Sequence, residues 1–483
     1  MNVLFTASEA VPFLKTGGLA DVIGALPKEL KKQGVNAQVI LPKYGNIPKQ
    51  FKEKMVHKTS ITVPVGWRNQ FCGIEYLEFD GIAFYFIDNE YYFRRGDGVY
   101  GFYDDGERYA YFCRAVLEAM PYLSEKPDII HCHDWQTGMI SVLMRAHFRN
   151  HPYYQGIKTM FTIHNLRYQG VFPKGILHDL LDLSELYYYP DGLEFYGNVS
   201  FMKAGLVYSD IVTTVSPTYA QEIQMPDYGE RLDGLLRKRS HELKGIVNGV
   251  DYALYNPETD PYLFSNYTKY SYEEKRMNKL GLQEKVGLPV DDMKPLIAVI
   301  TRLTDQKGID LILHVLQDIL VLDLQLIILG TGEREYENSL KEAAWQSPNK
   351  CSVHIYFDEG LARQIYAASD LFLMPSQFEP CGISQLLALR YGSLPIVRET
   401  GGLKDTVQRY NQNTKEGAGF SFTNYDAHDM LYTIKQAVEL YHQDKDTWSD
   451  LVWKAMSKDF SWTASAKEYK EVYRSLMNLP PLS

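Results

Sequence analysis

The later half of the chain contains two cations, a carboxylate and a Gly-rich turn. Such groups suit chemistry on a phosphate. Arg302 and Lys307 lie in one polar loop, between an apolar run and a helical pattern. Cations at the start of a helix bind anions, so the pair predicts a pyrophosphate clamp; two solvated surface cations are the alternative. Glu379 follows another apolar run, and the turn Thr400-Gly401-Gly402-Leu403 follows a third.

The pattern around these residues places them on one edge of a sheet. Apolar runs at 296–301, 324–329, 371–374 and 394–397 alternate with helical patterns. This alternation predicts a parallel sheet with right-handed crossovers. Its strand-to-helix turns lie together at the carboxyl ends of the strands, where ligands bind. A carboxylate beside backbone N–H groups at a helix start suits a sugar hydroxyl next to a phosphate.

The same glycine turn occurs near the start of the chain. Residues 15–22 read K-T-G-G-L-A-D-V, and residues 400–407 read T-G-G-L-K-D-T-V. A single Gly-Gly is explained by a tight turn between a strand and a helix. Two copies of T-G-G-L-x-D, one in each half, predict two similar domains that each offer a Gly-rich turn to a shared cleft. The length of 483 residues also favours two domains, and we expect their boundary near residue 250.

Polar side chains also follow apolar runs in the first half. Residues 131–135 read H-C-H-D-W, but neighbouring residues on a strand point to opposite faces, so these side chains cannot all bind one metal ion. Asp134 is better placed, at the predicted strand end. His164 follows the run at 159–163 and is expected to contact a substrate hydroxyl or to stabilise positive charge; packing is the alternative. Between 51 and 92 the pattern alternates, which predicts inserted antiparallel hairpins, and 91–107 is expected to be a loop.

Composition excludes several classes of protein. A net charge of −10 argues against general binding of nucleic acid, which needs a basic face. The five cysteines are scattered without a C-x-x-C, as in proteins of a reducing cytosol. The apolar run at 1–5 is too short for a signal peptide, and no run reaches the ~18 apolar residues of a membrane span. We therefore expect a cytoplasmic protein that binds neither nucleic acid nor membrane.

As a set, the motifs resemble one family along nearly the whole chain. They are K-T-G-G-L-A-D at 15–21, H-C-H-D-W at 131–135, T-I-H-N at 162–165, R-L-T-D-Q-K-G at 302–308, F-E-P-C-G at 378–382 and T-G-G-L at 400–403. In this order they resemble bacterial glycogen synthase and plant starch synthase. The resemblance implies a GT-B fold, an α/β architecture of two facing Rossmann-like, doubly wound domains with a deep interdomain cleft. It implies a first domain of 1–245, completed by a C-terminal helix at 461–483, and a second domain of 255–459.

The resemblance also implies an activity. It is that of a retaining glucosyltransferase, which moves glucose from ADP-glucose to the non-reducing 4-hydroxyl of an α-1,4-glucan such as glycogen, without a metal or other cofactor. The implied catalytic residues are Glu379, His164, Arg302, Lys307 and Asp134. Arg302 and Lys307 resemble the pair that neutralises the departing diphosphate. His164 resembles the residue that contacts the donor glucose, and Asp134 resembles a residue near the acceptor and the reacting sugar.

Further residues are implied to bind substrate. Lys15, Gly17 and Gly18 would approach the donor diphosphate, with Asp21 near the donor. Cys381 and Gly382 would line the glucose pocket with Glu379, while Thr400, Gly401, Gly402 and Leu403 would hold phosphate and sugar. Asn248 is also expected to bind substrate. Tyr356 and Phe357 both remain candidates for stacking on adenine.

Some alternatives stay open. Many GT-B relatives carry a second acid eight residues after the first, whereas residue 387 is Leu; the nearby Gln385 is typical of the synthases. A GT-B enzyme that uses a UDP-sugar is one alternative. A non-catalytic glycan-binding protein is another, since the 36 tyrosines would suit sugar stacking. Whether retention proceeds through a covalent intermediate or a front-face displacement is also open.

Overall fold

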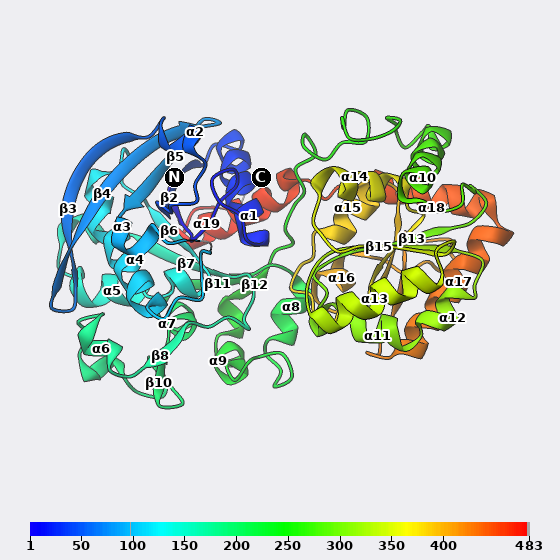
Figure 1. Cartoon of the computed structure of the whole chain (residues 1–483). Coiled ribbons are helices and arrows are strands. Elements are labelled where there is room, and N and C mark those ends of the chain that lie inside the picture. Colours follow the sequence, from blue (N-terminus) through cyan, green and yellow to red (C-terminus); the bar gives the residue numbers. More distant parts are fainter. Residues whose placement is uncertain (97, 481–483) are drawn as a thin grey trace. The chain divides into compact units, whose positions relative to one another are not determined.

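A computed structural model describes residues 1–96 and 98–480, so the predicted loop at 91–107 and helix at 461–483 each extend over residues outside this part. The chain divides into two compact units. The first consists of residues 1–248 together with the segment from Trp462 onward, and the second of Gly249–Ser461 (Figure 1). Each unit has its own sheet, and each is described by itself.

The first unit has a nine-stranded sheet in the order β12-β11-β7-β6-β1-β2-β5-β4-β3. The strands are β1 Asn2–Thr6, β2 Asn36–Pro42, β3 Val56–Val65, β4 Arg68–Phe79, β5 Ile82–Asp88, β6 Ile129–His133, β7 Lys158–Ile163, β11 Ile211–Thr214 and β12 Leu243–Gly245. All pairs are parallel except β3–β4 and β4–β5. The antiparallel hairpins expected between 51 and 92 are β3–β4 and β4–β5, and they extend the main sheet at its edge. A small antiparallel sheet holds β8 Val171–Pro173, β9 Glu194–Phe195 and β10 Asn198–Ser200.

Helices flank this sheet. The longer ones are α1 Gly18–Lys32, α4 Asp105–Ala119, α5 Ile140–His147, α7 Phe201–Tyr208 and α19 Trp462–Leu476, and the shorter ones are α2 Lys49–Lys52, α3 Glu90–Phe93, α6 Ile176–Asp179, α8 Pro217–Glu222 and α9 Asp233–Lys238. The segment expected to be a loop at 91–107 thus contains part of α3 and the start of α4. The last helix, α19, lies beside α1 (Figure 1), where Lys470 Nζ donates to Gln33 O and Thr463 Oγ1 donates to Glu29. Its tyrosines Tyr469 and Tyr473 are buried.

The second unit has a six-stranded parallel sheet in the order β15-β14-β13-β16-β17-β18. Its strands are β13 Leu296–Ile300, β14 Gln325–Leu329, β15 Cys351–His354, β16 Leu371–Met374, β17 Leu394–Arg398 and β18 Phe420–Phe422. Its helices are α10 Tyr272–Val286, α11 Ile309–His314, α12 Leu316–Leu320, α13 Arg334–Gln346, α14 Glu359–Ala368, α15 Ser384–Arg390, α16 Gly401–Thr406, α17 Ala427–Gln443 and α18 Lys445–Ser457. Figure 1 shows α14 and α15 on one side of this sheet and α11, α12 and α13 on the other.

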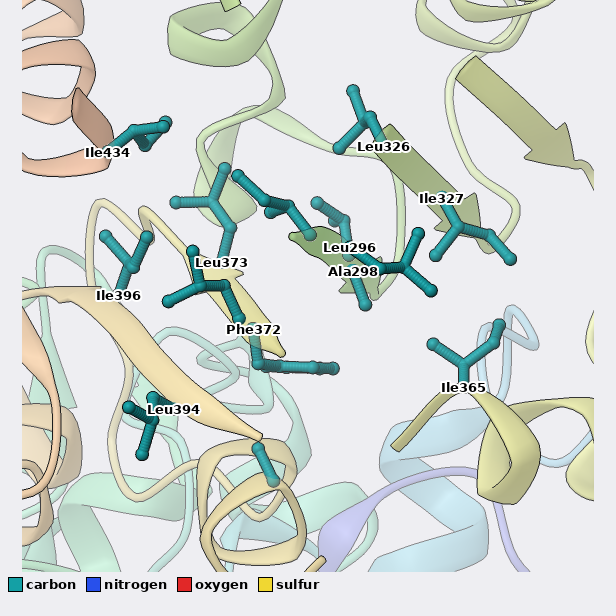
Figure 2. Packing of buried hydrophobic residues seen from close by; sticks show 14 of the residues in the cluster. Leu296, Ala298, Leu326, Ile327, Ile365, Phe372, Leu373, Leu394, Ile396 and Ile434 are labelled. Carbon is teal, nitrogen blue, oxygen red and sulfur yellow. The ribbon is translucent and has the colours of Figure 1, made fainter. Parts of the chain in front are cut away.

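Apolar side chains from the strands fill the space between sheet and helices. Figure 2 shows Leu296 and Ala298 of β13 near Leu326 of β14 and Phe372 of β16, the two neighbouring strands, and all four side chains are fully or almost fully buried. Because both faces are covered by helices, the strands read as continuous apolar runs instead of alternating ones. This is why they were recognisable in the sequence.

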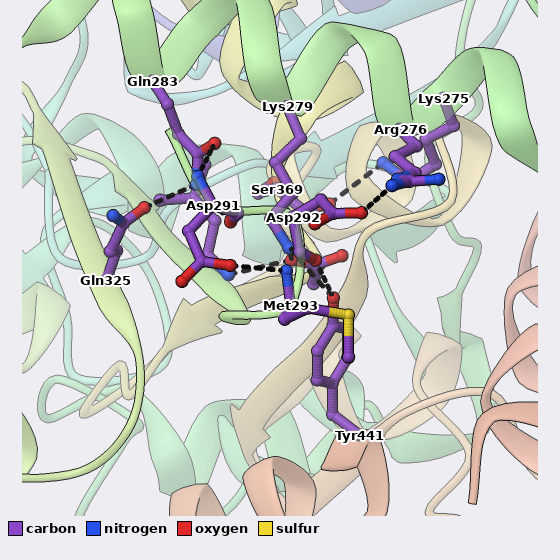
Figure 3. A network of polar contacts seen from close by, with 12 residues as sticks. Lys275, Arg276, Lys279, Gln283, Asp291, Asp292, Met293, Gln325, Ser369 and Tyr441 are labelled. Carbon is purple, nitrogen blue, oxygen red and sulfur yellow. Dashed lines mark hydrogen bonds and ion pairs between the residues drawn. The ribbon is translucent and has the colours of Figure 1, made fainter. Parts of the chain in front are cut away.

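A buried polar network ties α10 to the starts of the strands (Figure 3). Lys279 Nζ lies 2.8 Å from Asp370 Oδ2 and also donates to Asp292 O and to the Tyr441 hydroxyl. Lys275 Nζ donates to Ala367 O and to Ser369 O, and its burial lowers its pKa to about 7. Buried charges are tolerated only with such partners, so the network fixes the amino-terminal edge of the sheet. The opposite edge carries the turns that the sequence analysis singled out.

No helix in the described ranges 1–96 and 98–480 is both long and apolar enough to cross a lipid bilayer.

Candidate active site

Three strand-to-helix turns of the second unit interlock through their backbones. A Cβ at Gly401 would lie 1.9 Å from Glu379 O, and a Cβ at Gly402 would lie 2.0 Å from Cys381 O. Gly308, with φ of +74°, would place a Cβ 2.1 Å from the carbonyl oxygen of Pro375. These positions therefore require glycine because another backbone passes within contact distance. The turns after β13, β16 and β17 form one block at the carboxyl edge of the sheet.

Glu379 and Lys307 form an ion pair inside this block. Lys307 Nζ lies 2.6 Å from Glu379 Oε2, and the two side chains are only 15% and 9% exposed. The Ser376 hydroxyl donates to the same carboxylate oxygen at 3.1 Å. Arg302, in contrast, is exposed, and within residues 1–96 and 98–480 no ion pair or hydrogen bond of its guanidinium is found. The structure thus brings the carboxylate and one predicted cation together and leaves the other cation on the surface.

The backbone N–H groups of the Thr400–Leu403 turn are partly used within the protein. Gly402 N donates to Glu379 O at 3.1 Å and to Pro380 O at 3.2 Å, and Leu403 N donates to Thr400 O at 3.0 Å. These contacts hold the turn against the one that carries Glu379. The two glycines are therefore explained first by close packing against the backbone of residues 379–381, in addition to the tight turn expected of a single Gly-Gly.

Gln385 fixes the turn that contains Cys381 and Gly382. Its Nε2 donates to Cys381 O at 2.9 Å, to Gly382 O at 3.0 Å and to Thr406 Oγ1 at 3.2 Å. Cys381 is buried, and Gly382 has φ of +74°. Leu387, at the position where many relatives carry an acid, is also buried.

The two candidates for base stacking follow β15. Tyr356 is 48% exposed and Phe357 is 71% exposed, so both present a ring to solvent. The hydroxyl of Tyr356 lies 3.1 Å from His354 Nδ1, which holds that ring in place.

In the first unit, a buried carboxylate organises the K-T-G-G turn. Glu9 accepts from Thr16 N at 3.0 Å, from the Thr16 hydroxyl at 2.5 Å and from Gly17 N at 3.2 Å. Its burial raises its pKa above the usual value. Lys15 Nζ pairs with Asp21 Oδ1 at 2.8 Å across the start of α1, which begins at Gly18. Glu9 was not among the predicted site residues, because a single acid three residues after a buried strand is too weak a signal to single it out.

Asp134 joins the ends of two strands. It follows β6 with φ of +57°, a conformation rare for a residue other than glycine, and its Oδ1 accepts from His164 N at 2.8 Å and from Asn165 N at 3.5 Å. Burial raises the pKa of Asp134 to about 7. Such strain and such a pKa shift are typical of functional sites.

His164 contacts a second histidine. His133 Nδ1 lies 2.9 Å from His164 Nε2, and burial lowers the pKa of His164 to about 3. Asn248 ends the first unit as a buried side chain, and within the described ranges its Oδ1 has no hydrogen-bond partner. A search of the same ranges finds no group of histidine, cysteine and acidic side chains that could hold a metal ion.

Comparisons with known proteins identify the family. Residues 2–238 match the starch synthase catalytic domain, and residues 282–449 match the glycosyl transferases group 1. Glycogen synthase of Desulforamulus reducens is 57% identical over 477 residues, covering 99% of each chain. That of Geobacillus stearothermophilus is 56% identical, covering 99% of this chain and 98% of the relative.

Solved structures agree with this assignment. The catalytic domain of starch synthase IV from Arabidopsis thaliana, bound to ADP and acarbose, superposes with a TM-score of 0.89 at 35% identity, covering 99% of each chain. A sucrose-phosphate synthase from Thermosynechococcus elongatus, at 16% identity and a TM-score of 0.61, shares the fold. The resemblance drawn from the motifs and the predicted GT-B fold are both confirmed. The chain therefore belongs to the glycogen synthase and starch synthase family, enzymes that transfer a sugar from a nucleotide-sugar donor to a glucan acceptor.

Proposed function

We propose that this chain transfers glucose from ADP-glucose to the non-reducing 4-hydroxyl of an α-1,4-glucan, with retention of configuration, and so elongates glycogen. Membership of the family supports the reaction class, and the ADP bound to the related starch synthase supports the nucleotide. The observation that carries the proposal is the buried Lys307–Glu379 pair, held by interlocked turns at the carboxyl edge of a parallel sheet.

The chemistry explains why these residue types suit the reaction. Breaking the bond between glucose and phosphate builds positive charge on the sugar and negative charge on the leaving diphosphate. Lys307 and Arg302 are assigned to the diphosphate, where a preorganised donor is worth about 3–4 kcal/mol of transition-state stabilisation. The ion pair with Glu379 supports this role, because it holds the ammonium of Lys307 in one place before substrate binds.

Glu379, Cys381 and Gly382 are assigned to the glucose of the donor. The carboxylate is buried and faces an ammonium and a hydroxyl, so a sugar hydroxyl can bind to it without disturbing the turn. Thr400, Gly401, Gly402 and Leu403 are assigned to phosphate and sugar, and Tyr356 or Phe357 to adenine. Three backbone N–H groups of the Thr400–Leu403 turn, those of Thr400, Gly402 and Leu403, donate to carbonyl oxygens of the protein and hold the turn in place.

In the first unit, His164 and Asp134 are assigned to the reacting sugar and the acceptor. His164 is neutral, so its ring can donate a hydrogen bond to a sugar hydroxyl without adding a positive charge. Lys15, Gly17, Gly18 and Asp21 are assigned to the donor, with Asn248 among the substrate-binding residues. The unpartnered buried amide oxygen of Asn248 supports a ligand there.

Donor turnover tests the proposal. The protein is given glycogen with ADP-glucose or UDP-glucose, without added metal, and nucleotide release and glucan gain are followed. We expect ADP release with polymer growth, and α-anomeric signals of the new linkages in the proton NMR spectrum. Equal or better use of UDP-glucose would contradict the nucleotide assignment. Absence of turnover with either donor would favour a glycan-binding protein.

A matched pair of variants separates the site from the surface. Arg302→Ala is expected to abolish most turnover, whereas Arg334→Ala, which removes an exposed arginine at the start of α13, should leave turnover unchanged. Equal effects of the two substitutions would contradict the role assigned to Arg302.

A further inference from the structure

A row of histidine rings lies behind His164 in the first unit. His133 and His131 occupy alternate positions of β6, so their rings share one face of the sheet, with centroids 4.1 Å apart. His133 Nδ1 lies 2.9 Å from His164 Nε2. Burial lowers the pKa of all three imidazoles, so each ring is neutral and carries one N–H near neutral pH.

The contact between His133 and His164 needs one proton between its two nitrogens. If His164 donated from Nε2, His133 would carry its own N–H at Nε2, which is buried without a partner in the described part of the chain. If His133 donates from Nδ1, the same buried Nε2 holds only a lone pair. Buried N–H groups without an acceptor are the rarer case in proteins. The geometry therefore favours donation from His133 to His164.

The ring of His133 is held from several sides. Phe5 stacks on it, with centroids 5.7 Å apart and planes 14° apart. Behind it, His131 is fixed by the Tyr473 hydroxyl at 2.7 Å from Nδ1 and by Thr162 Oγ1 at 2.6 Å from Nε2. His133 cannot rotate without displacing these neighbours. The last helix, α19, thus contributes Tyr473 to the support of a residue at the strand ends.

We propose that His133 is a positioning residue, which donates from Nδ1 to His164 Nε2 and so holds His164 in the tautomer with its proton on Nδ1. His164 then offers one N–H donor and no basic nitrogen to a ligand, because no described residue accepts from its Nδ1. A hydroxyl oxygen of the sugar is the chemical class that such a donor binds. The part of the inference that concerns substrate rests on the proposed function; the tautomer does not.

The tautomer can be measured in the full chain without substrate. Nitrogen-15 NMR of protein labelled at histidine distinguishes Nδ1–H from Nε2–H, and His164→Gln identifies the signals of His164 by their loss. We expect the Nδ1–H form of His164, unchanged between pH 6 and 8. In His133→Phe the preference should be lost, and in His133→Asn, whose amide can donate from nearly the same position, it should be retained. The Nε2–H form in the unmodified protein, or an unchanged preference in His133→Phe, would overturn the proposal.

Kinetics give a second readout. His133→Phe should lower kcat by about 10–100-fold, as expected for a partner that orients a functional side chain, with KM for the donor within about twofold. His133→Asn should restore most of kcat. His147→Phe, which removes another partly buried histidine of the same unit, is the control and should leave kcat unchanged.

These outcomes separate two failures. Absence of turnover with any donor would refute the proposed function, while the spectra would still decide the tautomer. Equal loss of kcat in His133→Phe and His133→Asn, with the same tautomer of His164 in both, would mean that His133 has only a packing role. If His133→Phe does not fold, the spectrum of the unmodified protein still tests the inference.

Discussion

Replacing Lys307 by methionine, a side chain of similar volume, tests whether the buried pair is an electrostatic unit. Lys307 Nζ and Glu379 Oε2 are 2.6 Å apart. At an effective dielectric constant of about 20, their attraction is about 6 kcal/mol before desolvation is subtracted. In Lys307→Met the carboxylate stays buried with the Ser376 hydroxyl as its donor, and the loss of one partner of such a pair costs about 3–5 kcal/mol. For a domain of this size, that lowers the melting temperature by about 6–20 °C.

The double variant Lys307→Met/Glu379→Gln separates charge from packing. It has neither buried charge, so we expect it to be more stable than Lys307→Met alone by about 2 kcal/mol. Its turnover should nevertheless stay as low as that of the single variant, because both proposed functional groups are gone. Arg302→Met is the control: its side chain is exposed, so the free energy of unfolding should change by no more than about 0.5 kcal/mol.

Urea unfolding followed by tryptophan fluorescence measures these differences. Trp345, Trp448 and Trp453, three of the six tryptophans, belong to the second unit, so the change in emission includes the unfolding of the unit that contains the pair. Equal unfolding midpoints for Lys307→Met and Arg302→Met would refute the reasoning. A double variant whose loss of stability equals the sum of the two single losses would refute it as well, since independent side chains behave in that way.

Three further outcomes follow from the structure. Arg302→Ala should lower kcat by about 100–1,000-fold in steady-state kinetics, and near-normal turnover would contradict its role. Gly401→Ala should cost more than about 3 kcal/mol in thermal unfolding, since its Cβ would lie 1.9 Å from a carbonyl oxygen at φ of +44°, whereas Gly17→Ala, with 3.8 Å of space, should fold normally. Asp134 has a native pKa of about 7 against 3.8 unfolded, so between these values the native state binds the extra proton and stability falls as pH rises. Asp134→Asn should remove that slope from melting temperatures measured between pH 4 and 8, and an identical slope in both proteins would contradict it.

Several strands of the second sheet could be predicted because they are buried on both faces. The runs at 296–301, 371–374 and 394–397 became β13, β16 and β17, and the turns after them came together as the rule for parallel sheets requires. β18 was not predicted, because its apolar run of three residues is too short to stand out from a loop. The helical pattern after β13 forms two short helices, α11 and α12, because the backbone at Val315, with φ of −116°, leaves the helical region.

Contacts between distant segments could not be predicted from local patterns. Glu9 orders the K-T-G-G turn because the N–H groups of Thr16 and Gly17 donate to its carboxylate. A single acid after a strand does not reveal these contacts. Lys275 and Lys279 read as charges of a polar helix, yet both are buried in the network at the starts of the strands. Their partners Ala367, Ser369 and Asp370 lie more than 90 residues further along the chain, so only the fold identifies them.

The histidines show what the alternation of side chains along a strand predicts and what it does not. Alternation along a strand excluded a shared metal site for residues 131–133, and it also places His131 and His133 on the same face. The missing information was which strand lies next to β6. Because β7 is its neighbour, with His133 opposite Thr162, the ring of His133 reaches the histidine two residues further on. The candidate donor to His164 thus depends on strand order, which composition and periodicity do not contain.

The two T-G-G-L turns, equal in sequence, differ in physical role. In the later copy, Gly401 and Gly402 are required by two carbonyl oxygens at 1.9 and 2.0 Å from the positions of their missing Cβ atoms. In the early copy, the nearest atom to a Cβ at Gly17 is Glu9 Oε1 at 3.8 Å, so no neighbouring backbone demands glycine there. The backbone at Gly17 carries no side chain, and the Lys15–Asp21 ion pair lies nearby in the sequence. The later pair is therefore explained by the fold, whereas packing does not explain the early glycine, which the proposed function assigns to the donor.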